Sequence, residues 1–458
     1  MTAQKLVLPF VQMKNQLEVR TIVAPSTPNG VSAIAVVRVS GPQVQEVLRQ
    51  VLGKDLEKGS IRVREMTRAG ARDPRTGEPL DDLMCCVFLG PKSYTGEDVL
   101  EIFPHGNPLL VRHLVEAIRS VAGVRLADPG EFTRRAFEAG KIDLVQAEAI
   151  GQLLHATVES GLRNAERLLA GRLSQQITSL VEAVKKISAL LELEVDFAEE
   201  EADADQRGWQ EQLYAICTQL RALKKNFRSE ATENRTPAVV FYGAPNAGKS
   251  SLVNALLCDD RLLVSPKAGT TRDVVEVLLL LDRGEVRLMD TAGISSSPVD
   301  ELDMASQQKA RARIAQADLA IMLVEQGTPF LPPENPSHWV VQTKADLFDQ
   351  KSVGDGTAVS AHSSWGIAEF LQRLEAHLFP PQEVREEFWM ASERQLACLE
   401  NGLAGVERAL AHLQSGRSAP EELAFELFGV RESLAGITGQ ITTDAILDVI
   451  FSKFCIGK

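Results

Sequence analysis

The sequence predicts a multidomain protein that combines mixed α/β and all-α parts. Its 458 residues exceed the size of one ordinary domain, and its apolar (44%) and charged (24%) shares are typical of globular proteins. Strand and helix signals alternate in two separate stretches, whereas residues 132–200 lack proline and show helical periodicity. We therefore expect an N-terminal α/β domain, followed by a helical domain into which a second α/β domain is inserted.

The N-terminal α/β domain is predicted to span residues 1–135. Apolar and β-branched runs favour strands, and patterns that repeat every three to four residues favour helices. We expect strands at 31–39, 83–89 and 99–103, and helices at 43–52 and 108–121.

The helical domain is predicted in two parts, residues 136–232 and 380–458. From Leu162 to Leu191, apolar residues recur every three or four positions, which places them on one face of a long helix. A second helical segment is expected at 210–227.

The insert is predicted to span residues 233–379. It begins with an apolar strand at 238–242 and continues with alternating strand and helix signals, which favour a parallel sheet with crossover helices. Further strands are expected at 285–289 and 339–342, and Pro380 and Pro381 mark the end of the domain.

Composition limits the classes of partner. The formal charge of −13 argues against a stand-alone nucleic-acid binder that depends on electrostatic attraction. None of the six cysteines forms a C-x-x-C pair, so reduced thiols are expected. The sequence shows neither an apolar run of about 18 residues nor a secretory signal, so we expect a cytoplasmic protein with no membrane contact.

Residues 243–250 read Gly-Ala-Pro-Asn-Ala-Gly-Lys-Ser and fit the phosphate-loop pattern G-x-x-x-x-G-K-[ST]. A predicted strand precedes them and a helical segment at 252–257 follows, which favours this motif over a plain glycine turn. Backbone N–H groups would surround the phosphates, Lys249 would neutralise their charge, and Ser250 would bind Mg²⁺. The expected nucleotide contacts are Asn246, Ala247, Gly248, Lys249, Ser250 and Ser251.

Further motifs follow in the order of a Ras-like P-loop GTPase domain. Gly269–Asp273 supplies Thr271 to complete the Mg²⁺ shell, and Asp290 would hold the metal through water. Asp346 would distinguish guanine by accepting hydrogen bonds from its ring N–H and amino group. Together the motifs predict GTP binding, with contacts from Thr270, Thr271, Asp290, Thr291, Ala292, Gly293, Thr343, Lys344, Ala345, Asp346, Ser360, Ala361 and His362.

Thr343 departs from the usual GTPase pattern. Asparagine normally stands at this position and bridges to the phosphate loop, whereas threonine keeps a hydroxyl and lacks the amide. We expect guanine selectivity to survive through Asp346, with weaker nucleotide affinity.

From about Thr21 to Lys458 the chain resembles the MnmE (TrmE) family of tRNA-modification GTPases. The resemblance extends over every predicted domain. It includes the phosphate-loop variant Pro-Asn-Ala-Gly-Lys-Ser and the C-terminal tetrapeptide Cys-Ile-Gly-Lys. Further matching segments are Thr21–Ala24, Ser93–Glu101, Pro129–Phe137, Lys141–Ala149 and Gly269–Asp273.

The resemblance implies a fold and a reaction. The N-terminal domain would form a homodimer and bind 5-formyltetrahydrofolate. A flavin- and NADH-dependent partner of the MnmG type would join it in a heterotetramer. The complex would bind tRNA and add an aminomethyl or carboxymethylaminomethyl group to carbon 5 of the wobble uridine.

The resemblance also implies that K⁺ activates hydrolysis when two GTPase domains meet. A fixed cation would stabilise the charge that develops on the transferring phosphoryl group. The implied ligands are the Asn246 side-chain carbonyl and the backbone carbonyls of Ser265, Lys267 and Thr270. The alternative for Asn246 is that it only caps the loop.

The catalytic carboxylate is open between two residues. The family uses a glutamate to orient the attacking water, and alignment on the following helix puts Asp303 there, with Glu301 two residues earlier. Asp303 could reach through an adjusted loop, Glu301 could substitute, or hydrolysis could be slow. A solvated acidic loop is the remaining alternative.

For the folate, the resemblance carries over to Arg38, Glu101, Lys141 and Lys458. Arg38 and Lys141 suit a carboxylated ligand and Glu101 suits its amino-substituted ring, although an arginine that ends a strand is more often a surface charge. Cys455 would be a nucleophile if a neighbouring lysine lowered its pKa, or it would only place the tail against the folate pocket.

The sequence is compatible with three functions. The first is a GTPase that drives wobble-uridine modification, which the N-terminal and C-terminal signatures favour. The second is a GTP-regulated assembly factor or switch, for which the expected basic RNA-binding appendage is missing from the sequence. The third, suggested by Thr343 and Asp303, is a scaffold that binds GTP and hydrolyses it poorly.

Overall fold

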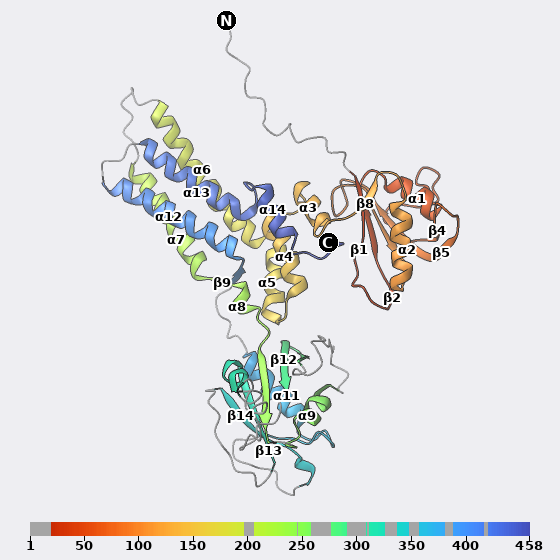
Figure 1. Cartoon of the computed structure of the whole chain (residues 1–458). Coiled ribbons are helices and arrows are strands. Elements are labelled where there is room, and N and C mark those ends of the chain that lie inside the picture. The colour runs from red at the N-terminus through yellow and green to blue at the C-terminus, as the bar shows by residue number, and fades with distance from the viewer. Residues whose placement is uncertain are drawn as a thin grey trace. The chain divides into compact units, whose positions relative to one another are not determined.

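The computed structural model describes residues 20–196, 206–244, 246–257, 276–290, 308, 311–325, 337–347, 357–380, 388–415 and 420–458. The chain divides into two compact units. One contains residues 1–151, 167–220 and 397–458, and the other contains residues 152–166 and 221–396. Figure 1 labels many of their elements. Within the described residues, no helix has the length and apolar character needed to cross a membrane.

The first unit contains a six-stranded sheet in the order β4-β5-β6-β3-β1-β8. All neighbours are antiparallel except β1 and β8, which run parallel. The strands are β1 (Thr21–Pro25), β3 (Val37–Ser40), β4 (Thr67–Arg72), β5 (Pro79–Phe88), β6 (Val99–Phe103) and β8 (Val124–Leu126).

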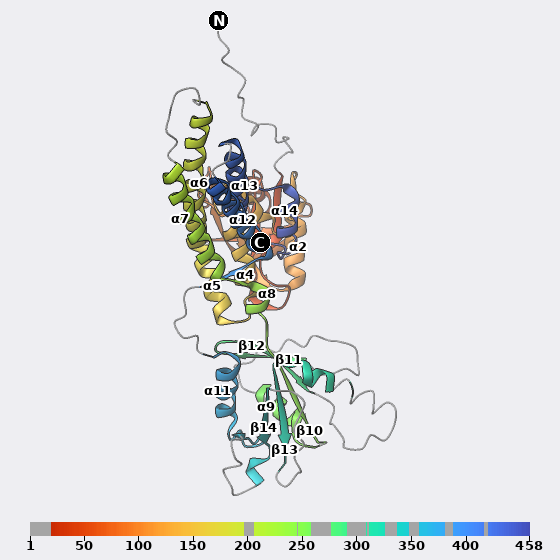
Figure 2. The same ribbon diagram turned by 90° about the vertical axis from the view of Figure 1, so that its left-hand side faces the viewer.

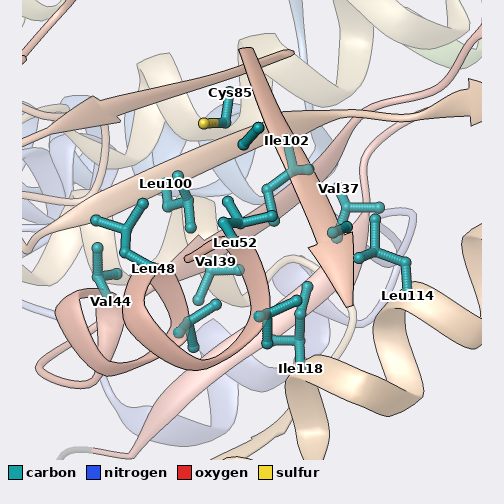
Figure 3. Close-up of a cluster of buried hydrophobic side chains, with 14 of the residues drawn as sticks. Val37, Val39, Val44, Leu48, Leu52, Cys85, Leu100, Ile102, Leu114 and Ile118 are labelled. Carbon is teal, nitrogen blue, oxygen red and sulfur yellow. The ribbon is translucent and has the colours of Figure 1, made fainter. Parts of the chain in front are cut away.

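Two helices, α1 (Val44–Leu52) and α2 (Pro108–Arg119), cover one face of this sheet. In α1, apolar residues at positions 44, 47, 48, 51 and 52 form one buried stripe. Figure 3 shows Leu48 of α1 and Ile118 of α2 in the same cluster as Val39 of β3. The Asn107 side chain caps α2 by accepting hydrogen bonds from two backbone N–H groups. This packing fixes the sheet whose other face carries Arg38.

The predicted strand at 31–39 is wrong as a single element. Its first part is β2 (Ser32–Ile34), which pairs with β7 (His105–Gly106) in a separate two-stranded ribbon and is exposed. Its second part is β3, which is largely buried in the large sheet. An apolar run without a turn residue gives no local signal for this change of partner.

The remaining helices of this part of the chain include an antiparallel helical layer. Gly402 and Gly405 of α12 (Glu393–Ser415) lie against Leu434 and Val430 of α13 (Pro420–Thr438), which also packs on α6 (Arg172–Asp196). Both views show α6, α12 and α13 side by side (Figures 1 and 2). The other helices that lie wholly or mostly in this unit are α3 (Glu131–Glu138), α4 (Leu144–His155), α7 (Gln206–Lys225) and α14 (Asp444–Phe451), whereas most of α5 (Glu159–Leu169) belongs to the second unit.

The predicted long helix from Leu162 to Leu191 is two helices. It breaks between α5 and α6 at Gly171, which has a φ of 74° and therefore ends the first helix in a left-handed conformation. The apolar spacing continues across the break, which is why periodicity alone did not reveal it.

The second unit contains a sheet in the order β11-β12-β10-β13-β14-β15, with only β11 antiparallel to its neighbour. One face packs on α9 (Lys249–Leu257) and α11 (Ile367–Leu378), and the other packs on Ile314. The strands are β10 (Ala238–Gly243), β11 (Glu276–Leu281), β12 (Gly284–Asp290), β13 (Leu319–Val324), β14 (His338–Gln342) and β15 (Thr357–Ala358). Smaller elements are β9 (Phe227–Ser229), α8 (Glu230–Glu233), η1 (Ala345–Leu347) and β16 (Trp389–Ala391).

Candidate functional site

The phosphate loop connects β10 to α9 at the carboxyl edge of the parallel sheet. Gly243 has a φ of 150°, and a Cβ there would lie 2.4 Å from the Leu323 carbonyl of β13. Gly248 has a φ of 84°, and Asn246 has a φ of 65°, a left-handed conformation that asparagine tolerates better than most residues. These backbone angles let the chain turn tightly between strand and helix, where its N–H groups can meet an anion.

Lys249 is the first residue of α9 and is only 9% exposed. Its Nζ donates hydrogen bonds to the carbonyls of Gly243 (3.2 Å) and Ala244 (2.9 Å). The ammonium group therefore lies against the loop at the amino end of a helix, where a phosphate would be stabilised. Ser250 and Ser251 follow on the same helix and are exposed.

Thr343 connects the phosphate loop to the segment after β14. Its hydroxyl donates to the Ala247 carbonyl at 2.8 Å, and its backbone N–H donates to the Val324 carbonyl at 3.0 Å. The side chain also lies close to Gly248, because a Cβ on that glycine would be 3.5 Å from the Thr343 Cβ. The hydroxyl thus makes a direct contact with the phosphate loop.

Asp346 lies in η1 beside the loop that follows β15. Ser360 donates from its hydroxyl to Asp346 Oδ1 at 2.5 Å, and this hydrogen bond lowers the pKa of the Asp346 carboxyl. Lys344 has a φ of 58°, and its Nζ pairs with Glu325 at 2.9 Å. The backbone N–H of Ala345 donates to the Val359 carbonyl. Asp346 is therefore an ionised acceptor held by its neighbours.

A hollow of about 160 Å³ joins these groups. It brings residues of α9 and the phosphate loop together with the segments after β14 and β15. Its lining is Gly248, Ser251, Leu252, Thr343, Lys344, Asp346, Leu347, Val359, Ala361 and His362. A planar ligand with N–H groups that reach Asp346 would also lie beside the phosphate loop.

Several predicted site residues lie outside the described part of the chain. These are Ser265, Lys267, Thr270, Thr271, Thr291, Ala292, Gly293, Glu301 and Asp303. The backbone of Asp290 is described, and it ends β12 opposite Phe241 of β10. The choice between Asp303 and Glu301 therefore stays a prediction.

In the first unit, Arg38 and Glu101 form an ion pair across neighbouring strands. They are directly opposite in the register of β3 and β6. Arg38 donates from Nε (3.1 Å) and Nη2 (2.9 Å) to the same oxygen, Glu101 Oε1. The side chains are 16% and 23% exposed, so Arg38 is not a freely solvated surface charge.

The other two predicted folate residues lie on segments that border this sheet. Lys141 Nζ donates to the Pro91 carbonyl, in the loop that leads to β6. The chain's last residues lie at the end of β1, where the Ser26 hydroxyl donates to the Gly457 carbonyl at 2.9 Å. Gly457 therefore lies beside the end of β1, the strand that pairs with β3, and Lys458 follows it directly. Cys455 is exposed, and its carbonyl accepts a hydrogen bond from the Gly130 N–H.

Two aromatic residues at this site were not predicted. The Arg38 Cζ lies 5.3 Å from the ring centre of Tyr94 and 5.7 Å from that of Phe132. Both residues belong to segments by which the chain resembles its family, Ser93–Glu101 and Pro129–Phe137. That resemblance was the available signal, but it did not say which side chains surround Arg38.

Three features define a P-loop GTPase. They are the tight glycine-containing phosphate loop, the buried Lys249 at the start of α9, and the hollow beside β14 that is lined by the Asp346 carboxylate. Two family descriptions match the chain: "GTP-binding protein TrmE N-terminus" over residues 21–141 and "MnmE helical domain" over residues 144–455. The chain belongs to the MnmE family of tRNA modification GTPases.

Curated relatives align with nearly the whole chain. The relative from Chlorobium chlorochromatii, "tRNA modification GTPase MnmE", is 34% identical and covers 97% of this chain and 100% of its own length. Proteins of the same name from Bradyrhizobium sp. and Aeromonas hydrophila are 37% and 36% identical, and each alignment covers 96% of this chain and 99% of the relative. The resemblance stated from the sequence is thereby confirmed at the level of the family.

Proposed function

We propose that this protein is a K⁺-activated GTPase that modifies tRNA. With a flavin-dependent MnmG-type partner, it installs an aminomethyl or carboxymethylaminomethyl group at carbon 5 of the wobble uridine, using a tetrahydrofolate one-carbon unit. The observation that carries the GTPase part is the hollow that joins Gly248 of the phosphate loop to the Asp346 carboxylate. The family relationship supports the tRNA part.

In the proposed GTPase reaction, the loop residues bind and orient the nucleotide. Lys249 and the N–H groups at the start of α9 offset the charge of the β- and γ-phosphates. Asp346 accepts hydrogen bonds from guanine, and Thr343 keeps the phosphate loop next to the base. Ser360, Ala361 and His362 border the base.

The loop offers oxygen donors that fit the two proposed cations. Ser250 at the start of α9 is an exposed residue whose hydroxyl suits Mg²⁺, and Asn246 is an exposed residue whose amide oxygen suits K⁺. Thr271 would complete the Mg²⁺ site, and Ser265, Lys267 and Thr270 the K⁺ site. Bound cations would stabilise charge on the transferring phosphoryl group.

The proposed folate site is the Arg38–Glu101 pair with Lys141 and Lys458. Arg38 Nη1 and Glu101 Oε2 have no hydrogen-bond partner in the described part of the chain, so a donor and an acceptor remain for a ligand. A folate carries both carboxylate groups and an amino-substituted ring, which suits this combination. We infer a cytoplasmic homodimer that forms a heterotetramer with its partner and binds tRNA.

Two measurements test the proposed function. GTP turnover by the full-length protein should rise severalfold when K⁺ replaces Na⁺ at equal ionic strength, and Lys249→Ala should abolish GTP binding. Wobble nucleosides from cells that lack the protein should lose the 5-aminomethyl-type modification in mass analysis. Intact modification in those cells would overturn the tRNA part, and unchanged GTP affinity in Lys249→Ala would overturn the site.

A further inference from the structure

The guanidinium group of Arg38 lies between two aromatic rings. Its Cζ is 5.3 Å from the ring centre of Tyr94 and 5.7 Å from that of Phe132. These distances are within the range of cation–π attraction. Glu101 accepts the Nε and Nη2 hydrogen bonds on a third side. Three different segments therefore restrict the orientation of one cation.

Both rings are held in place by the same helix, α3. Phe132 and Thr133 are consecutive residues of α3 and are fully buried. The Tyr94 hydroxyl is hydrogen-bonded to Thr133 Oγ1 at 2.9 Å. The helix thus contributes one ring directly and anchors the other through its phenol.

The loop that carries Tyr94 is also tied to α3 by an ionic contact. Glu97, three residues after Tyr94, accepts hydrogen bonds from Arg135 of α3 at 2.9 Å and from the Ser40 hydroxyl at 2.7 Å. Arg135 also donates to Glu131 on its own helix at 2.7 Å. Because Ser40 belongs to β3, like Arg38, the loop, the helix and the strand are held as one arrangement.

We call Tyr94, Phe132 and Glu101, which surround the Arg38 guanidinium, the Arg38 clamp. This clamp leaves some N–H groups of Arg38 available to a ligand. Of the five N–H groups of a guanidinium, two donate to Glu101 Oε1, and the Nη1 pair has no partner in the described part of the chain. We propose that Tyr94 and Phe132 are positioning residues that fix the plane of Arg38, so that its remaining N–H groups meet the oxygen atoms of a folate-class ligand. This inference rests on the proposed folate site. A preoriented guanidinium loses less conformational freedom on binding than a mobile one.

Binding of 5-formyltetrahydrofolate to the full-length protein tests the positioning role. Tyr94→Leu removes the ring face and should weaken binding about tenfold, as expected for a lost cation–π contact. Tyr94→Phe keeps the ring and should retain affinity within about threefold, since it loses only the bond to Thr133. Tyr214→Leu makes the same change on α7 and should bind like the wild type. Equal affinity of Tyr94→Leu and the wild type, both with unchanged GTP turnover, would overturn the proposal.

A second measurement works without any folate. Phenylglyoxal modifies accessible arginines, and peptide mass mapping gives the rate at Arg38. We expect this rate to rise severalfold in Tyr94→Leu and in Phe132→Leu, and to stay near the wild-type rate in Tyr94→Phe. An unchanged rate in both leucine variants would overturn the clamp. The wild type could bind no 5-formyltetrahydrofolate while Arg38 is still modified faster in the leucine variants. That result would support the packing of the two rings against Arg38 and would overturn the proposed folate site.

Discussion

The hydroxyl of Thr343 donates a hydrogen bond to the carbonyl of Ala247 at 2.8 Å. Both residues are 3% exposed, so the bond is shielded from water. It fastens the segment that contains Asp346 to the phosphate loop. The substitution of threonine for the usual asparagine therefore retains a bridge, although one with a single donor.

Removing this hydroxyl should loosen the phosphate loop. Thr343→Val keeps the shape of the side chain and leaves the buried Ala247 carbonyl without this donor, which costs about 1–3 kcal/mol. We expect GTP affinity to fall about tenfold in a titration with a fluorescent GTP analogue. Thr343→Ser keeps the hydroxyl and should match the wild type. If the valine variant binds GTP as tightly as the serine variant, the bridge does not support the loop.

The Asp346 carboxylate should determine which base is bound. Asp346→Asn replaces one acceptor oxygen by an amide donor, which suits the extra carbonyl of xanthine and not the amino group of guanine. We expect GTP hydrolysis at limiting substrate to fall about 100-fold and XTP hydrolysis to rise, because the variant would leave polar groups of bound guanine without a matching partner. Asp282→Asn, an exposed residue after β11, is the matched control. Unchanged preference for GTP in Asp346→Asn would remove Asp346 from the site.

Local sequence patterns predicted individual strands better than they predicted tertiary contacts. The strand at 99–103 and the start of the strand at 238 match the structure, because each is a short apolar run between turn signals. Gly171 interrupts the predicted helix from Leu162 to Leu191, and the apolar spacing on both sides of it concealed this break. Arg38 and Glu101 were singled out by resemblance alone. Their contact with each other depends on strand register, which periodicity does not specify.

Cys85 and Cys455 lie in different environments, so we expect them to be alkylated at different rates. Cys85 is fully buried, and burial raises the pKa of its thiol to about 11, whereas Cys455 is exposed. At pH 8 about 0.1% of Cys85 would be thiolate, and this fraction rises about tenfold per pH unit up to about pH 10. Iodoacetamide should therefore modify Cys455 first and spare Cys85 in the folded protein, as followed by peptide mass mapping. Modification of Cys85 as fast as that of Cys455 at pH 8 would contradict this assignment.

Gly457 should be required for the docking of the C-terminal tail. Its φ is 98°, and a Cβ there would lie 2.0 Å from the Pro25 carbonyl, so an alanine would need both strained backbone and movement of the tail. Gly457→Ala should displace Lys458 and lower 5-formyltetrahydrofolate affinity about tenfold, since left-handed strain alone costs about 1–3 kcal/mol. GTP turnover should stay unchanged, because the phosphate loop lies in the other unit. Gly30→Ala, where a Cβ meets no atom within 4 Å, is the matched control. Full folate affinity in Gly457→Ala would show that the tail is not part of the pocket.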